Sequence, residues 1–449
     1  MLGIALCALA LIVTLLTARR SLPAGIGVTL FFGYMYGITR ANIAETAGHF
    51  IFDAAVIGLY AGLLIRRRNP IARRKIRRIM PWFLILVGWP FVMLLMPLQD
   101  PMIQLVGFRA QVFFLPFLLI GAMLDDEDLY SIVYWIGALN LLAFGFAIAE
   151  YFIGVQKFFP LSEMTRSLVY GSNDVLGNQM RIPSTFVASA SYGGVMVLSL
   201  PWLVGAWVQK EIRGWNRGFI AVAFFAAAIG VFLSASRTQA LILIALVIVI
   251  AFTMRARAGT YVGWAVLVGA AAWLVVSAPR LQRVTTIRDA SYVETRLHNS
   301  ANASFFAAAE QHPLGIGLGA GGTSIPYFLR ERLNAEDSIV IENEYARIML
   351  EQGLPGLFIW LAFIGWVLTR AAPRRSDKWF LSRRLAYVVV ALVLATGAIG
   401  IGMLSWAPGT AELLILVGWI SAPRIVRVPA AARNRVMEQE HLQPLLFGR

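Results

Sequence analysis

The sequence predicts an all-α polytopic membrane protein. Of its 449 residues, 59% are hydrophobic and only 14% are charged, whereas soluble domains are close to half apolar and a quarter charged. The mean hydropathy is +0.70. Because one aqueous core cannot hide this much apolar surface, the composition excludes a soluble enzyme and the disordered and fibrous classes. The single cysteine, Cys7, excludes an intrachain disulfide and a cysteine-rich metal site.

Apolar runs set the expected number of membrane spans. A spanning helix needs about 20 predominantly apolar residues. We expect about 12–13 transmembrane helices, from the runs 2–18, 22–38, 49–65, 79–98, 105–123, 130–153, 185–206, 218–234, 240–254, 259–278, 346–369, 385–404 and 408–422. Arg19 and Arg20 follow the first run rather than precede it, so we interpret this run as a retained helix with its N-terminus outside.

The basic residues orient these helices. Of the 39 lysine and arginine residues, 26 fall in connecting segments of one side, at 19–20, 66–78, 210–217, 255–257, 370–384 and from 424 onwards. The positive-inside rule makes this side cytoplasmic. Orientation therefore accounts for the net charge of +15, and we expect no nucleic-acid partner.

Two polar stretches, 154–184 and 279–345, then lie outside the cell membrane. The second is too long for an ordinary connection and carries aromatic residues and both signs of charge, which favours an ordered lid. The expected organisation is an N-terminal helical membrane region 1–153, an extracytoplasmic loop 154–184, core helices 185–278, a large extracytoplasmic loop 279–345, C-terminal membrane helices 346–422 and a cytoplasmic basic tail 423–449.

The ionisable residues in or next to the predicted spans include Asp53, Arg109, Glu150, Arg237 and Glu412, all at the outer ends. Such residues are costly in a bilayer and tend to mark functional sites, although each alone could snorkel to the interface. Together with the two outer loops they indicate a polar chamber that opens outward. A coupled transporter would instead place such groups near the midplane.

Two arginines have a setting suited to phosphate. Arg237 ends the SASR motif at an outward turn between two apolar helices, and Arg181 begins RIPSTF at the outer entrance of the 185–206 helix. The planar guanidinium fork matches phosphate oxygens, although an interfacial anchor is the alternative for both residues. Two guanidiniums on one diphosphate would hold a leaving group without a metal.

A glycine-rich segment, HPLGIGLGAGG, runs from His312 to Gly322. Gly317, Gly319 and Gly322 satisfy GxGxxG by count, but no strand precedes them, so a dinucleotide site is not expected. The glycines allow a tight turn, whose N–H groups either face an anion or sugar or have no ligand. The histidines lack metal-ligand spacing, so we expect neither a metal nor another cofactor.

The segment IENEYARIMLEQGLPGL, residues 341–357, opens a membrane helix at its outer mouth. Arg347 has Glu344 and Glu351 within helical reach, so part of this charge is structural pairing. Glu342 has no basic residue at i+4. In a semi-dry chamber it is suited to act as a general base, and complementing the helix dipole is an equal alternative.

The order of these motifs resembles the O-antigen ligase and O-antigen polymerase superfamily of bacterial envelope glycan enzymes. The resemblance rests on the SASR-type turn, the large outward loop with HPLGIGLGAGG and the ENEYARIMLEQGLPGL segment, and it covers residues 181–366. It implies a GT-C-like membrane glycosyltransferase in the bacterial inner membrane. The implied donor is an undecaprenyl-diphosphate-linked glycan, and the implied partners are lipid-linked oligosaccharide, membrane lipids and chain-length regulator or export-complex proteins.

The resemblance also implies roles for single residues. Arg181 and Arg237 match the arginines that bind the donor diphosphate, and the position that usually reads His-Asn reads Glu342-Asn343 here. Glu342 is therefore the candidate catalytic base, and the departure favours a polymerase over a ligase. Supporting candidates are Arg109, Asn343, Tyr345, Arg347, His312, Gly317 and Gly319.

The function expected from these observations is inverting polymerisation of lipid-linked repeats for O-antigen or exopolysaccharide. A ligase that transfers glycan to lipid A core is the nearest alternative. From other classes, a transporter of polyprenyl lipid or polysaccharide and a structural partner of an export complex stay open.

Overall fold

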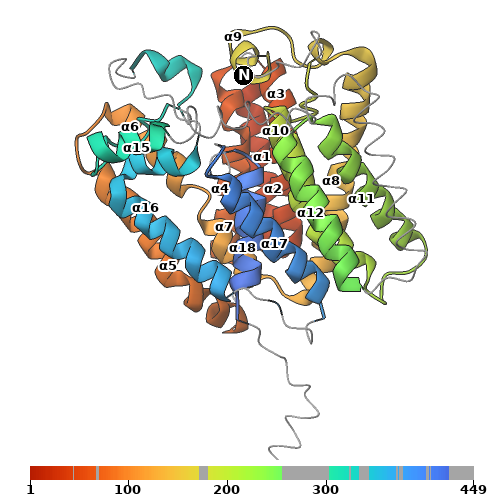
Figure 1. The fold of residues 1–449 in the computed structure, drawn as a ribbon. Coiled ribbons are helices and arrows are strands. Elements are labelled where there is room, and N and C mark those ends of the chain that lie inside the picture. Colours follow the sequence, from red (N-terminus) through yellow and green to blue (C-terminus); the bar gives the residue numbers. More distant parts are fainter. Residues whose placement is uncertain are drawn as a thin grey trace, which may run out of the picture.

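The computed structural model describes residues 1–43, 45–66, 70–170, 180–254, 303–322, 325–332, 343–370, 378–400 and 406–423, with 373 and 404. Within these ranges every regular element is helical and no strand occurs. Long helices run roughly side by side, with α17 and α18 near the centre of the view (Figure 1). The predicted all-α polytopic class is confirmed.

The N-terminal region pairs two close-packed helices. Its elements are α1 (Leu2–Arg20), α2 (Leu22–Tyr34), α3 (Tyr36–Asn42), η1 (Thr46–Phe50) and α4 (Ile51–Ile65). A Cβ atom at Gly58 or Gly62 of α4 would come within 2.4 or 2.6 Å of a carbonyl oxygen of α1. These glycines let the two backbones approach, as small residues do between membrane helices.

The next region includes α6 (Pro101–Val112), a helix that contributes residues to two parts of the candidate site. It comprises α5 (Pro70–Leu94), α6 (Pro101–Val112), α7 (Pro116–Met123) and α8 (Asp126–Ile153). Asp100 caps α6, because its Oδ1 accepts from the Met102 amide at 2.8 Å. Gly121 of α7 lies against the Ile415 carbonyl of α18, where an added Cβ would come within 2.1 Å.

The middle region contains the most buried span. It begins with η2 (Val155–Lys157), α9 (Glu163–Thr165) and η3 (Arg166–Tyr170), followed by α10 (Ser189–Trp207), α11 (Trp215–Leu233) and α12 (Arg237–Met254). Nearly all residues of α10 are buried, because α8, α11, α12, α17 and α18 surround it. A helix that is apolar all round belongs in such a core position.

The C-terminal region contains α15 (Ala303–Gln311), η6 (Tyr327–Arg332), α16 (Glu344–Arg370), α17 (Phe380–Thr396) and α18 (Gly409–Ser421). α16 is kinked at Gly353, whose φ of 70° is in the left-handed region. It lies beside α5 and below α15 in the view (Figure 1).

The described residues contain nine helices long and apolar enough to cross a membrane, and the α2–α3 pair, bent by 44°, gives a tenth. α17 and α18 match the predicted runs 385–404 and 408–422 but have only 17 and 13 residues. The predicted run 259–278 lies outside the described residues, as does most of the predicted tail 423–449. α16 begins at Glu344, two residues before the predicted start.

Basic side chains tie helices together at the end away from α9 and α15. Lys75 Nζ donates to the Leu124 carbonyl and to Asp125 Oδ1, both at 2.8 Å. Lys378 forms an ion pair of 2.8 Å with Glu211. α9, α15 and the N-terminus lie at the opposite end of the bundle (Figure 1). The described parts of both long polar stretches therefore lie at the end that is poor in these basic residues.

Candidate functional site

The SASR turn, Ser234 to Arg237, joins α11 to α12 and rests on α10. Ser234 Oγ donates to the Val231 carbonyl at 2.7 Å and accepts from the Ser236 amide at 3.3 Å. The turn can approach the α10 backbone closely because Gly193 has no Cβ. An added Cβ at this position would come within 2.4 Å of Ser234 Oγ. Arg237 is the first residue of α12. The turn therefore places Arg237 at the rim of the bundle.

Arg181 lies against this turn. Its Nε donates to the Ser234 carbonyl at 3.3 Å, although the two residues are 53 positions apart. The structure thus brings the Arg181 side chain to the motif that ends in Arg237.

A buried carboxylate anchors the segment that carries Arg181. The Ser184 amide donates to Glu150 Oε2 at 2.8 Å, and Ser184 Oγ donates to the Ala143 carbonyl at 2.6 Å. Both Glu150 and Ser184 are fully buried. Sequence analysis singled out Glu150 as an ionisable residue in a span but did not find this partner. Little in the sequence around Ser184 predicts this contact, since the positive φ of 54° at Ser184 is visible only in the structure.

The start of α16 is fixed to the C-terminal end of α17. The Glu344 amide donates to the carbonyls of Gly397 at 2.9 Å and Gly400 at 3.1 Å. Tyr345 Oη donates to the Leu394 carbonyl at 2.6 Å. α17 also packs against α12, so α12, which begins at Arg237, and α16 flank the same helix.

The catalytic candidate Glu342 lies outside the described residues. Its neighbour Asn343 is buried and caps α16, because Asn343 Oδ1 accepts from the Ala346 amide at 2.8 Å. The role predicted for Glu342 stays a prediction.

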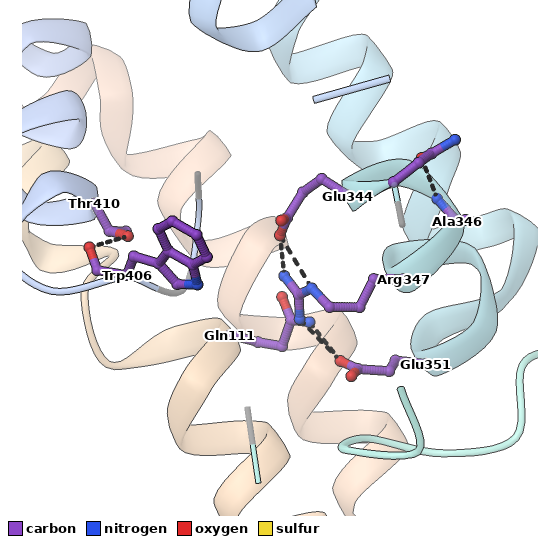
Figure 2. Close-up of polar contacts among 8 residues, drawn as sticks. Gln111, Glu344, Ala346, Arg347, Glu351, Trp406 and Thr410 are labelled. Carbon is purple, nitrogen blue, oxygen red and sulfur yellow. Dashed lines mark hydrogen bonds and ion pairs between the residues drawn. The ribbon is translucent and has the colours of Figure 1, made fainter. Parts of the chain in front are cut away.

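Arg347 lies in a closed charge cluster between α16 and α6 (Figure 2). Its guanidinium contacts Glu344 through Nε at 3.0 Å and again through Nη2, and it contacts Glu351 Oε2 through Nη1 at 3.1 Å. Gln111 Nε2 of α6 donates to the same Glu351 oxygen at 2.7 Å. These are the two helical pairs that the spacing predicted. With no exposure at Arg347, the cluster stabilises the α16–α6 contact.

The glycine-rich segment is wedged between α6 and α16. The Ile316 amide donates to the Leu350 carbonyl and the Leu354 amide to the Pro313 carbonyl, both at 2.8 Å. A Cβ at Gly107 of α6 would come within 2.3 Å of the Gly319 nitrogen. Gly317 and Gly319 have φ of 106° and 83°, so glycine is needed for both the turn and the close approach.

The anion that this turn faces is part of the protein. The Gly319 N–H lies near the Glu351 carboxylate. Gly317 and Gly319 are buried. His312 is half-buried, and its backbone carbonyl accepts a hydrogen bond from the Gly315 amide at 2.9 Å. A supporting role for these residues toward a ligand stays a prediction.

The other ionisable residues of the spans also have internal partners. Arg109 forms a two-pronged contact with Asp53, with Nε to Oδ2 at 3.0 Å. Glu412 faces the Tyr34 hydroxyl. Tyr34 Oη in turn donates to Asn140 Oδ1 at 2.9 Å, within the buried core.

Sequence analysis missed Tyr34 and Asn140. The signal that could have found them is a lone polar side chain within an apolar run, which in a membrane needs a partner.

Among the described residues, no three His, Cys, Asp or Glu side chains are placed to share a metal ion. The expectation that neither a metal nor another cofactor is needed stays a prediction.

Residues 222–361 match the protein family described as O-antigen ligase. Over this stretch, about a third of its length, the chain is similar to the O-antigen ligase and polymerase superfamily. The matched segment includes Arg237, the glycine-rich turn and the mouth of α16, whereas Arg181 and Arg109 precede it. Members of this superfamily are glycosyl-transferring enzymes, and the several apolar helices make the chain a multi-pass membrane protein. None of the curated proteins compared with the chain matches it.

Proposed function

We propose that the chain is an inverting glycosyltransferase that polymerises undecaprenyl-diphosphate-linked oligosaccharide repeats at the outer face of the bacterial inner membrane. The observation that carries this proposal is the contact of Arg181 with the SASR turn that ends in Arg237. Within a superfamily of glycosyl-transferring enzymes, two guanidinium-bearing segments at one rim supply what a diphosphate leaving group needs.

The arginines would act on the leaving group. Diphosphate already leaves well, so catalysis needs positioning and charge stabilisation more than covalent help. Each charge-assisted hydrogen bond contributes about 1.5–3 kcal/mol. Arg181 and Arg237 would hold the diphosphate oxygens as the bond from the anomeric carbon to the diphosphate oxygen breaks. This chemistry requires no metal or cofactor.

Glu342 would act on the acceptor. An acceptor sugar hydroxyl attacks the anomeric carbon from the face opposite the leaving group, and the hydroxyl proton passes to the Glu342 carboxylate. The new bond joins the acceptor oxygen to the anomeric carbon, and the configuration inverts.

The product would be O-antigen or exopolysaccharide, with lipid-linked oligosaccharide as substrate and membrane lipids around it. Chain-length regulators and export-complex proteins would be its protein partners. A ligase that transfers glycan to lipid A core is the second candidate. The pair Glu342-Asn343, where the ligases carry His-Asn, favours the polymerase.

The test is the length of surface polysaccharide in a deletion strain complemented with single variants. We expect Arg237→Ala and Glu342→Gln to abolish long chains while single repeats still reach the cell surface, at unchanged protein abundance. Arg166→Gln is the matched control, because Arg166 is an exposed arginine at the same end of the bundle. Normal chain lengths in both variants would remove the enzyme proposal. Loss of every repeat from lipid A core, with lipid-linked glycan accumulating, would identify a ligase.

A further inference from the structure

We propose that Arg40 and Arg109 form a second anion-binding site, and that it takes the diphosphate headgroup of the acceptor lipid. The inference rests on the proposed function: a polymerase joins two substrates that each carry a lipid diphosphate. One arginine pair for the donor leaves the second headgroup without a cationic partner.

The site combines Arg109 of α6 and Asp53 of α4 with Arg40 of α3. Arg109 of α6 binds both oxygens of Asp53, and the side chains of Arg109 and Asp53 are 37% and 10% exposed. Arg40 Nη1 of α3 donates to Tyr36 Oη at 3.4 Å, and its guanidinium lies 5.6 Å from the centre of that ring. The Tyr36 ring lies 6.2 Å from the ring of Phe52, the residue before Asp53. Two guanidiniums and one carboxylate therefore lie in this region, which leaves an excess positive charge.

The Arg40 guanidinium has hydrogen-bonding capacity left over. Its Nε is buried and donates to no acceptor among the described residues. Both Asp53 oxygens are already bound by Arg109. Glu45, the nearest acid along the chain, accepts from the amides of Leu2 and Gly3 and from the N-terminal amine. A buried donor without an acceptor is costly, and a phosphate oxygen would satisfy it while Arg109 remains half exposed to share the anion.

The groups around Arg40 do not neutralise its positive charge, so a negatively charged ligand would be attracted to it. They are the Tyr36 hydroxyl, which donates to the His49 carbonyl at 3.0 Å, the imidazole of His49 and the Asp53 carboxylate. Only Asp53 is acidic, and Arg109 neutralises it. The remaining charge is that of Arg40.

The second site adjoins the donor site. The Ile38 amide of α3 donates to the Thr185 carbonyl at 3.0 Å. A Cβ at Gly37 would come within 2.0 Å of the Phe186 carbonyl carbon, so the α3 backbone lies directly on the segment that follows Arg181. The helix that carries Arg40 therefore contacts the segment that begins with Arg181. Two lipid headgroups held there would bring donor and acceptor sugars to the same region above the bundle.

The test counts binding sites for farnesyl diphosphate, a short lipid diphosphate, on the full chain in phosphatidylcholine nanodiscs, by native mass spectrometry and calorimetry. We expect two sites in the wild type. Arg40→Gln should weaken one of them at least tenfold, Arg237→Ala the other, and Arg166→Gln neither. Arg40→Lys, which keeps the charge but loses the fork, should weaken the same site severalfold. If Arg40→Gln does not fold, Arg40→Lys alone decides, and wild-type affinity in it overturns the proposal.

The outcomes separate the two proposals. Two intact sites in Arg40→Gln, with one lost in Arg237→Ala, overturn the acceptor site and leave the proposed function standing. Two intact sites in Arg237→Ala remove the donor assignment on which both rest. Repeating the titration with phosphatidylglycerol in the nanodisc distinguishes the sources of phosphate: if it occupies only the Arg40-dependent site, that site binds general anionic lipid and the acceptor assignment fails.

Discussion

Two arginine–carboxylate clusters flank α6 and differ in both charge balance and exposure. In the first, one guanidinium, Arg347, lies between two carboxylates, and its side chain is 0% exposed. In the second, Arg109 binds Asp53 and is 37% exposed, and Arg40 contacts the neighbouring Tyr36 hydroxyl. Arg109 and Gln111, two positions apart on α6, point to different clusters, as helical spacing requires.

The difference assigns the clusters different tasks. Buried charges persist only when they are paired and hydrogen-bonded, since an unpaired one is strongly destabilising. Every charge of the Arg347 cluster is engaged by another member, so its role is to hold α16 against α6. The Arg40 cluster has excess charge and partial access to the outer face, so it can exchange contacts with a ligand.

The largest expected effect comes from breaking the closed cluster. Arg347→Leu leaves Glu344 and Glu351 buried without their cation, and removing one partner of a buried pair costs about 3–5 kcal/mol. Thermal unfolding of the detergent-purified protein should show a large fall in the midpoint. Arg370→Gln, at the exposed end of the same helix, is the control. Equal midpoints in both variants would mean that the cluster does not support the fold.

A smaller effect is expected from the open cluster. Asp53→Asn keeps the side-chain shape but removes the charge bound by Arg109, and hydrogen bonds to charged groups are worth about 1.5–3 kcal/mol. The loss in stability should therefore be smaller than that of Arg347→Leu. Farnesyl diphosphate should bind severalfold more tightly at the Arg40-dependent site, because the competing carboxylate is gone. Weaker binding would show that Asp53 positions Arg109 for the ligand rather than competing with it.

The smallest effect on stability is expected from an exposed ion pair, which serves as the reference for the two clusters. Lys378 and Glu211 are 46% and 54% exposed, and such pairs contribute little. The hydrogen bond from Lys378 lowers the pKa of Glu211. This contribution is present above the ordinary pKa of a glutamate, about 4.3, and is lost as the pH falls through the lowered folded value.

Lys378→Gln should therefore match the wild-type unfolding midpoint closely at pH 7, with the small difference vanishing near pH 3. A difference that grows on acidification would contradict this assignment of the pair.

The membrane class and the approximate spans could be predicted because composition and run length report directly on exposure to lipid. The Arg347 pairs could also be predicted, since positions three and four apart meet on any helix. The partner of Arg109 could not, because Asp53 is 56 positions away and hydropathy does not say which helices are neighbours. For the same reason the docking of the glycine-rich turn on Gly107 was not foreseen. Run length also extended the α17 prediction beyond its last residue, Thr396, although the residues that follow, 397–400, are turn and irregular structure.

The shortness of α17 affects how a substrate can enter. Its 17 residues rise about 26 Å, less than the hydrocarbon thickness of about 30 Å. A 17-residue helix that starts at one interface therefore ends short of the other. The first amide of α16 is bonded to the Gly397 carbonyl and so begins at that depth. In the proposed function, a prenyl-anchored sugar would reach this level sideways from the outer leaflet while its tail stays in the lipid.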